Sequence, residues 1–338
     1  MRVLRLFFIA AILTVFFSAS APCASAQATS AEDTAQTPVE RHGQLSIAGP
    51  HIIDTHGAIT SLAGPSFFWS NTGWGQERFY TKGAVESFAK DWNAGIIRVA
   101  MGTQGNGNYL EDPDANIDRV ERVVEAAIEN GLYVIIDWHS HQAEQDIDEA
   151  KTFFTAIAKT YGETPNVIYE IYNEPLDTTD WASVVKPYSE DLIKTIRAID
   201  PDNLIIVGTQ SWDQDVDKAA DDPITGQSNI LYALHFYAAS HKSDLRKKAR
   251  YAIMKGLPLI LSEWGSVTYT GDGTFDPKSA RKWMKFAKKH HLSHLNWAVS
   301  DKAESASMFR PSASSDGKWT DKDLTPSGQL VREIMRDW

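Results

Sequence analysis

The stretch YVIIDWH, at Tyr133–His139, decides the fold, because its first four residues are apolar and it ends in polar and aromatic side chains. The run LIIVGT, at Leu204–Thr209, has the same character. Neither run alternates between apolar and polar residues, which is typical of strands that are covered on both faces. We therefore expect a parallel sheet that is buried on both sides.

Six more runs of this kind follow the same pattern, and helix-period segments separate them. The segment from Asn116 to Asn130, for example, places its apolar residues on one face and stops at Gly131. Strands that alternate with helices predict a single domain built as an α/β fold, the (β/α)8 TIM barrel. An open doubly wound sheet would carry a glycine-rich phosphate loop after its first strand, and GTQGNG at 102–107 lacks that spacing. The expected strands are Ser61–Trp69, Ile96–Met101, Tyr133–His139, Val167–Asn173, Leu204–Thr209, Ile230–Tyr237, Pro258–Glu263 and Leu295–Ser300.

Composition narrows the class of protein. The 338 residues include 33 Lys and Arg against 44 Asp and Glu, a formal charge of −11, and a single Cys. A chain of this length can bury a large core without disulfide or metal staples. Its acidity makes it a poor ligand for nucleic acid or for an anionic membrane, so we expect neither as a partner.

The N-terminal residues predict export. Arg2 and Arg5 precede an apolar run from Leu6 to Phe17, and a small-residue triplet ends at Ala26. This pattern is typical of a secretory signal peptide over residues 1–26. We expect a disordered leader at 27–43, the barrel at 44–338, and a secreted monomer, extracellular or periplasmic, that is free of the membrane after cleavage.

Polar and aromatic residues gather where the predicted strands end. Active sites of (β/α)8 barrels lie at the carboxyl ends of the strands, so these residues are expected to converge. Tryptophan rings there can offer apolar faces to sugar rings, whereas Trp138 and Trp264 are expected to pack in the core. The strand-end residues are Trp69, Trp74, Arg98, His139, His141, Asn173, Glu174, Trp212, His235, Tyr237, Glu263, Trp264 and Trp297.

Two carboxylates directly follow apolar strands: Glu174 in YEIYNEP and Glu263 in LILSEWG. Either alone is explained as a salt-bridge or helix-cap residue. As a pair from the fourth and seventh strands, they fit the hydrolysis of a glycosidic bond with retention, which needs one protonated and one ionised carboxyl about 5 Å apart. A rival interpretation is a metal site of Asp137, His139 and His141, but no HExxH-type spacing supports it, and we predict neither metal nor cofactor.

The segments NVIYEIYNEP, ILYALHFYAASH, LILSEWG, YVIIDWH and NWAVSDK resemble glycoside hydrolase family 5, in particular its bacterial endo-β-1,4-glucanases. The likeness runs from about Leu45 to Trp338 and implies a retaining cellulase that acts on β-1,4-glucan polysaccharide or oligosaccharide. It implies Glu174 as acid/base and Glu263 as nucleophile. The remaining residues that it implies are Arg98 and Tyr237 beside the nucleophile, Asn173 on the sugar 2-hydroxyl, His235 between the two carboxylates, His139 on a sugar hydroxyl, Trp74, Trp212 and Trp297 as platforms, and Lys302 and Glu304 toward the non-reducing side.

Two departures from the family pattern leave the finer substrate preference open. The loop SFFWSNTGW lacks a His that is usual there, and Gly102 stands where an aromatic residue is common. A β-mannanase, a xylanase or a mixed-linkage glucanase on the same scaffold is the alternative within enzymes. A catalytically inactive sugar-binding protein is the alternative from another class, although it would be expected to lack one of the two carboxylates.

Overall fold

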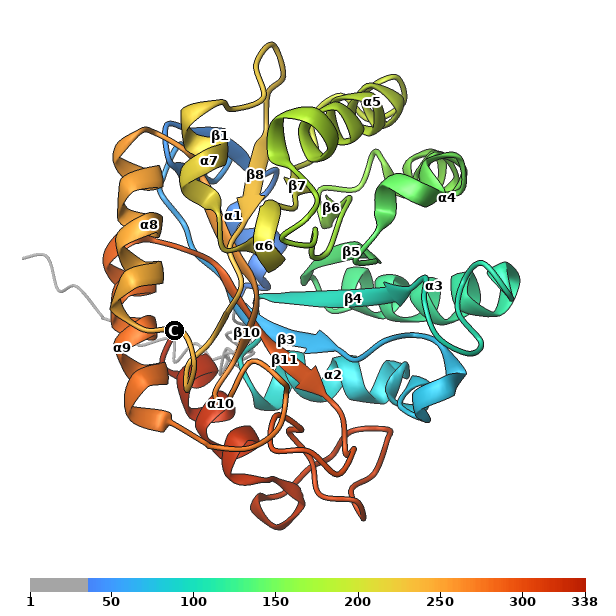
Figure 1. Cartoon of the computed structure of the whole chain (residues 1–338). Helices are drawn as coiled ribbons and strands as arrows, with labels where there is room; N and C mark the ends of the chain where they lie inside the picture. Colours follow the sequence, from blue (N-terminus) through green and yellow to red (C-terminus); the bar gives the residue numbers. More distant parts are fainter. Residues whose placement is uncertain (1–35) are drawn as a thin grey trace, which may run out of the picture. The chain divides into compact units, whose positions relative to one another are not determined.

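A computed structural model describes residues 36–338 (Figure 1). The predicted signal peptide and residues 27–35 of the predicted leader lie outside the described residues. The leader prediction is wrong for its last part, because helix α1 forms at Pro38–His42. Thr37 caps this helix: its hydroxyl accepts from the Glu40 amide at 3.3 Å, and the Glu40 carboxylate accepts from the Thr37 amide at 2.8 Å. This capping box specifies a helix that apolar periodicity could not reveal.

Eight parallel strand positions close into a barrel (Figure 1), and all eight predicted strands are confirmed. β11 pairs with both β10 and β3, and this pairing closes the ring. The sixth position consists of two short segments, β8 and β9, which both pair with β10. The strands are β3 (Ala63–Phe67), β4 (Ile96–Gly102), β5 (Tyr133–His139), β6 (Val167–Glu170), β7 (Ile205–Val207), β8 (Ile230–Ala233), β9 (Phe236–Tyr237), β10 (Leu259–Gly265) and β11 (His294–Val299).

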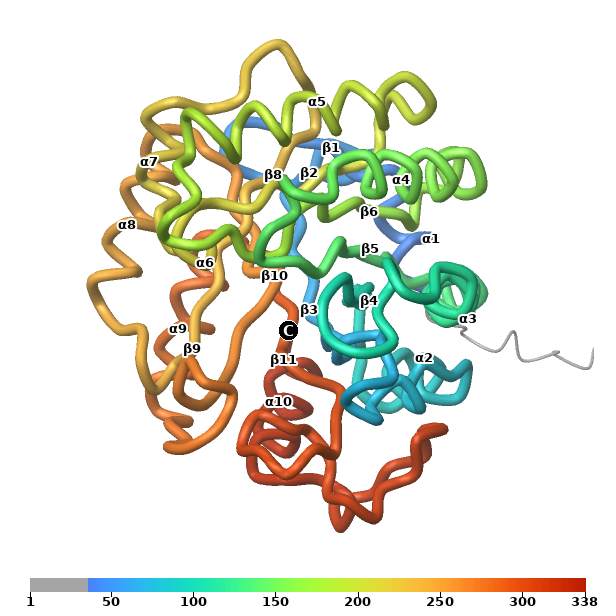
Figure 2. Tube along the Cα trace, turned by 45° about the vertical axis from the view of Figure 1, so that its right-hand side comes forward, coloured from blue at the N-terminus to red at the C-terminus, as the bar shows by residue number. Residues whose placement is uncertain are grey.

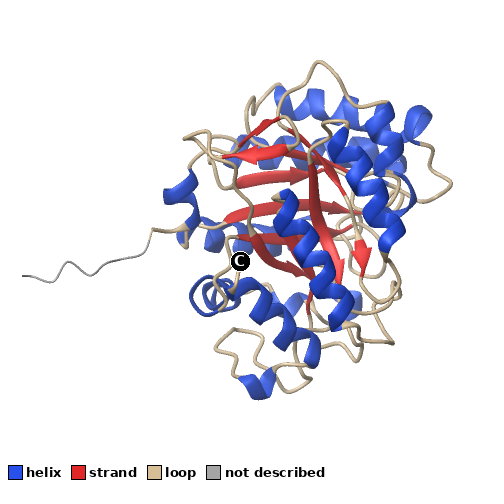
Figure 3. Ribbon diagram, turned by 90° about the vertical axis from the view of Figure 1, so that its left-hand side faces the viewer, coloured by secondary structure: helices blue, strands red, loops and turns tan. Residues whose placement is uncertain are grey.

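Helices surround the barrel (Figure 3). Proline in the first turn starts α3, α5, α9 and α10, where its fixed φ suits the helix and its missing amide costs nothing. No helix among residues 36–338 has the length and apolarity needed to cross a bilayer. The helices after α1 are α2 (Lys82–Asp91), α3 (Pro113–Glu129), α4 (Ile147–Tyr161), α5 (Lys186–Arg197), α6 (Gln210–Asp213), α7 (Val216–Asp221), α8 (Ser243–Met254), α9 (Pro277–His290) and α10 (Pro326–Arg336).

A small antiparallel hairpin of β1 (Ser46–Ala48) and β2 (His51–Ile53) closes the end of the barrel where the strands begin (Figure 2). Leu45 and Ile52 are buried in one apolar cluster with Ile96, the first residue of β4. The hydroxyl of Tyr133 donates to the Gly43 carbonyl at 2.5 Å. The amino ends of the strands are therefore sealed, and the carboxyl ends remain for a site.

Candidate active site

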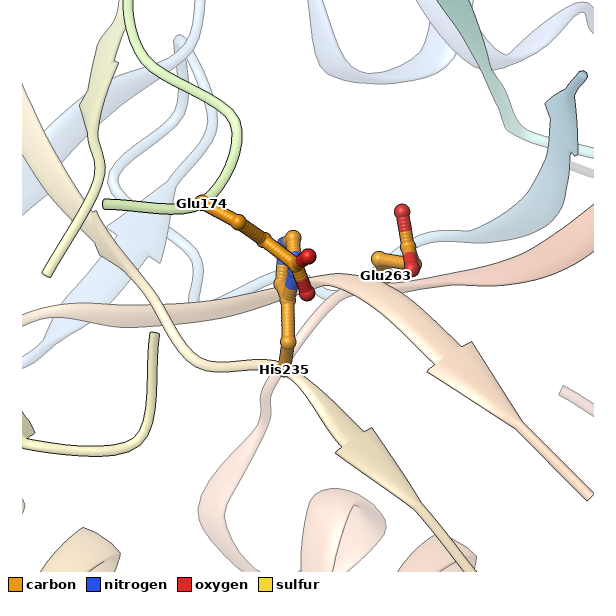
Figure 4. Close-up of side chains that lie close together, drawn as sticks. All are labelled: Glu174, His235 and Glu263. Carbon is orange, nitrogen blue, oxygen red and sulfur yellow. The ribbon is translucent and has the colours of Figure 1, made fainter. Parts of the chain in front are cut away.

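The two predicted catalytic carboxylates meet at the carboxyl ends of the strands. Glu263 lies within β10, and Glu174 follows β6. An oxygen of each carboxylate and a ring nitrogen of His235 all lie within 4.8 Å of one another. Figure 4 shows the Glu174 carboxylate close to the His235 ring, with Glu263 beside them. This separation suits a nucleophile and an acid on one glycosidic bond, because retaining glycosidases place their carboxyl groups about 5–5.5 Å apart.

Backbone hydrogen bonds to β5 place Glu174. After Glu170 the Ile171 amide still donates to the Ile206 carbonyl of β7 at 3.0 Å, but the register with β5 shifts, and the Asn173 amide donates to the Trp138 carbonyl at 3.2 Å. The Glu174 amide donates to the Ser140 carbonyl at 3.2 Å. The acid is thus held by the end of the neighbouring strand, which explains why β6 is shorter than the predicted run.

Arg98 lies at the centre of a fully buried polar network. Its Nη1 donates to Glu263 Oε2 at 3.1 Å, as predicted from the sequence, and its Nη2 donates to Asn173 Oδ1 at 2.6 Å. Its Nε donates to Glu170 Oε2 at 2.6 Å, and Asp137 lies 2.9 Å from Nη2. One guanidinium therefore fixes the nucleophile candidate and the predicted sugar ligand together, because its planar fork presents several donors at set angles.

Glu263 has donors on both oxygens. The hydroxyl of Tyr237 donates to its Oε1 at 2.7 Å, on the side away from Arg98. Burial, followed by the negative charge of Glu174, raises the pKa of Glu263, whereas Arg98 and Tyr237 act in the opposite direction. These two donors fix the orientation of the carboxylate and favour its ionised form.

Glu174 lies between two imidazoles. His235 Nδ1 is 3.0 Å from its Oε1, and His141 Nε2 is 3.2 Å from its Oε2. Burial acts to raise the pKa of Glu174, but the hydrogen bonds and charges of these two histidines outweigh burial and hold it below its usual range. These contacts therefore favour an ionised Glu174.

His139 and Trp297 form a stacked pair. Their ring centroids are 5.1 Å apart with an interplanar angle of 1°. His139 Nδ1 is 2.6 Å from Asp137 Oδ2, and burial, followed by the charge of Arg98, holds the pKa of His139 well below its usual range. A neutral ring whose Nδ1 donates to Asp137 leaves Nε2 as an acceptor, which suits a sugar hydroxyl.

A cavity of about 560 Å³ adjoins Glu174. Trp212 lines it, with 38% of its surface exposed, and so does Tyr269, which is 70% exposed and was not predicted from the sequence. Trp74, 45% exposed, lies outside this cavity and carries the Lys302 ammonium 4.9 Å from its ring centroid. Lys302 in turn pairs with Glu304 at 2.7 Å, so these two predicted residues form one unit beside Trp74.

Asp137, His139 and His141 do not converge on one point, as the rival metal site would require. Asp137 already faces the guanidinium of Arg98 and the ring of His139. Within residues 36–338, the ligand-type side chains that converge closely enough for a cation are instead Glu174, His235 and Glu263.

Two buried acidic residues escaped the sequence prediction. Glu170 is fully buried beside Arg98, and Asp213 is fully buried with its Oδ2 3.3 Å from His235 Nε2. Burial acts to lower the pKa of His235, but Asp213, then Glu170 and Glu174, hold it well above its usual range. A carboxylate inside an apolar strand was the available signal for Glu170, because a buried charge requires a partner.

The glycine at position 102 has a local explanation. A Cβ there would lie 2.8 Å from Asn71 Oδ1 and 3.0 Å from the Trp69 ring. The Trp69 ring in turn packs edge-on against His139, with centroids 4.3 Å apart. Trp69 therefore occupies the space beside His139 that a larger residue at 102 would need.

A buried catalytic-type carboxylate pair at the mouth of a (β/α)8 barrel defines the class of glycoside hydrolases. The profile of the cellulase family, glycosyl hydrolase family 5, matches residues 53–303, and the chain belongs to this family. The resemblance found in the sequence is thereby confirmed.

Curated relatives carry endoglucanase names. The chain is 51% identical over 278 residues to endoglucanase Z of Dickeya dadantii, covering 82% of this chain and 63% of that protein. It is 39% identical over 296 residues to an endoglucanase of Clostridium saccharobutylicum, covering 87% and 65%. The chain thus spans slightly less than two thirds of the length of these two relatives.

Solved structures share the fold over most of the chain. A protein from Cytophaga hutchinsonii is 44% identical with a TM-score of 0.87, covering 89% of this chain and 97% of that one. The catalytic domain of a Thermobifida fusca endoglucanase is 36% identical with a TM-score of 0.84, covering 89% and 100%. A variant of that domain has been solved in complex with cellotetraose.

Proposed function

We propose that this protein is a secreted endo-β-1,4-glucanase that cleaves internal bonds of β-1,4-glucan by a retaining double displacement. The observation that carries this proposal is the convergence of Glu174 and Glu263 within 4.8 Å at the open end of the barrel. The endoglucanase names of the relatives and the cellotetraose complex support a glucan as the substrate.

In the first step, a carboxylate oxygen of Glu263 attacks the anomeric carbon of the sugar. The bond from this carbon to the glycosidic oxygen breaks, and that oxygen takes a proton from Glu174. In the second step, Glu174 accepts a proton from water while the water oxygen attacks the same carbon and releases Glu263. Proton donation therefore alternates with proton acceptance at Glu174.

The contacts support the two proposed roles. Arg98 and Tyr237 both donate to Glu263, which suits a nucleophile that must be ionised when it attacks. Glu174 has neither contact and lies between the imidazoles of His235 and His141. Asn173, held by Arg98, would hydrogen-bond the sugar 2-hydroxyl, a contact that strengthens in the transition state.

Three aromatic side chains are candidates for sugar platforms. Trp212 borders the cavity beside Glu174, and Trp297 lies against His139. Trp74 adds an exposed ring beside Lys302. Such platforms suit the apolar faces of pyranose rings, and several of them suit an enzyme that acts on a polymer.

The test is the initial rate of reducing-sugar release from carboxymethylcellulose, β-mannan, xylan and mixed-linkage glucan. The wild type is expected to prefer carboxymethylcellulose, and Glu174→Gln and Glu263→Gln are each expected to lose at least about a hundredfold in rate. A preference for another polysaccharide would keep the mechanism and replace the substrate. Full activity in either variant would refute the assigned carboxylates.

A catalytically inactive sugar-binding protein is disfavoured, because both carboxylates are present with partners suited to chemistry. If binding were the function, the wild type would retain cello-oligosaccharides without releasing any reducing sugar.

A further inference from the structure

Glu174 contacts two histidines that differ in access to solvent. The side chain of His235 is 2% exposed, and that of His141 is 31% exposed. Glu174 itself is 14% exposed. Of the two imidazoles on this carboxylate, His141 is the one with a route to water.

His235 is held in place by buried partners. Its Nε2 lies 2.9 Å from Ser262 Oγ and 3.3 Å from Asp213 Oδ2. Because both of its nitrogens face acceptors in a buried environment, the ring remains protonated and cannot trade its proton readily with solvent.

His141 is fixed by a different set of contacts. Its Nδ1 lies 3.2 Å from Gln104 Oε1, and its carbonyl accepts from the Tyr172 hydroxyl at 3.1 Å. The Trp69 ring packs against it, with centroids 5.9 Å apart. An amide oxygen only accepts, so Nδ1 carries a hydrogen and Nε2 is left to face Glu174.

One proton between His141 Nε2 and Glu174 Oε2 satisfies both groups in either location. If Nε2 holds it, an imidazolium donates to a carboxylate; if Oε2 holds it, a carboxylic acid donates to a neutral imidazole. The 3.2 Å separation allows transfer between these two states.

We propose that His141 is a positioning residue for the acid/base of this enzyme, which stores and returns the proton that Glu174 uses. This proposal rests on the function proposed above. Before the first displacement, Nε2 gives its proton to Oε2, and Glu174 then protonates the leaving oxygen. In the second displacement, the proton that Glu174 takes from water passes to the neutral Nε2 of His141. From there it can pass on to solvent.

The charged groups around His141 agree with a stored proton. Burial acts to lower its pKa, and the charge of His235 acts in the same direction. The hydrogen bond to Glu174, its charge and that of Glu263 outweigh them, so the pKa of His141 is raised. His139 also lies nearby and stays neutral.

The first test is the pH dependence of kcat/KM on a cello-oligosaccharide. In the wild type the alkaline limb reports loss of the proton that His141 and Glu174 share. In His141→Gln it reports loss of the proton from Glu174 alone. His141→Gln keeps a hydrogen-bonding side chain but carries no titratable proton, and its alkaline limb is expected to move about one pH unit or more toward acid. In His141→Leu the alkaline limb should move in the same direction, and kcat should be lower than in His141→Gln.

His42→Gln provides a matched control, since His42 Nδ1 lies 3.3 Å from Asp54 Oδ2 in another imidazole–carboxylate pair. This control should leave the profile unchanged. An unmoved limb in His141→Gln, or a shift toward alkaline pH, would overturn the proposal, because a purely structural or charge-lowering role predicts those results.

The second test does not depend on activity. NMR titration of the ring signals, with His141 assigned through His141→Gln, should give a pKa above 6.5 that falls by about one unit or more in Glu174→Gln. An unchanged pKa would refute the shared proton even in an active enzyme. A wild type that cleaves no glycan but shows the coupled titration would refute the proposed function and leave the pair intact.

Discussion

Removing the charge of Arg98 should destabilise the barrel severely. Arg98 is fully buried and faces the carboxylates of Asp137, Glu170 and Glu263 at 2.9, 2.6 and 3.1 Å. In Arg98→Met these carboxylates lose their cation, and breaking a buried pair in this way costs about 3–5 kcal/mol. Because three partners are affected, we expect a loss in the free energy of unfolding near the upper end of that range.

A double-mutant cycle isolates the Arg98–Glu170 pair. Glu170→Gln keeps the shape and removes the charge, and its cost should be smaller because Arg98 retains its other carboxylates. If the two side chains interact as the 2.6 Å contact indicates, the double variant should cost at least about 1 kcal/mol less than the sum of the single variants.

Urea unfolding at pH 7, followed by circular dichroism, measures these quantities. Arg281 and Glu333 form a control pair at 2.8 Å with 52% and 62% of their side chains exposed. In Arg281→Met the loss should stay below about 1 kcal/mol, because exposed ion pairs are screened by solvent. A cost below about 1 kcal/mol for Arg98→Met would show that its charge does not stabilise the barrel, and strict additivity in the cycle would show that Arg98 and Glu170 do not interact.

Three further predictions concern single side chains. His294 is fully buried and accepts from Trp264 Nε1 at 3.1 Å, and burial lowers its pKa to about 3. As the pH falls below about 6.5, His294 is protonated in the unfolded chain but not in the folded one, so the free energy of unfolding decreases. In urea unfolding, the wild type should lose about 2 kcal/mol more than His294→Gln between pH 7 and pH 5. Equal losses in the two proteins would contradict this. A Cβ at Gly265 would lie 2.3 Å from the Tyr237 ring, so Gly265→Ala should lower kcat at least about tenfold by displacing that ring, and an unchanged kcat would count against its contact with the nucleophile. Trp212→Ala should raise KM on cello-oligosaccharides about tenfold, because deleting this partly exposed ring removes about 1.4 kcal/mol of contact with the sugar. An unaltered KM would show that Trp212 does not bind the substrate.

The apolar runs were sufficient to predict the eight strands, because a parallel barrel buries both faces of each strand. Their ends were less predictable. β6 ends at Glu170, before the end of the predicted run Val167–Asn173, because its pairing with β5 shifts register there and the Asn173 amide bonds to the Trp138 carbonyl. Capping by Thr37 likewise formed a helix where composition indicated disorder.

The predicted site residues lie at the barrel mouth, but their buried supports were harder to find. Asp213 follows Trp212 in a segment where Ser211, Trp212 and Asp213 all have positive φ. The residue types of this segment do not predict that conformation. His141 was predicted only as one of the strand-end residues and as a ligand of the rival metal site, because sequence spacing could not show that its ring turns toward Glu174. Side-chain direction at loop positions depends on packing that a one-dimensional pattern does not contain.

Covalent trapping tests whether Glu263 is the nucleophile of a retaining mechanism. The protein would be incubated with a 2-deoxy-2-fluoro cellobioside that carries a dinitrophenyl leaving group, and the labelled peptide would be identified by mass spectrometry. We expect one glycosyl ester per chain, on Glu263, and its slow hydrolysis with recovery of activity. A label on Glu174, or turnover of the substrate without any covalent adduct, would contradict this expectation.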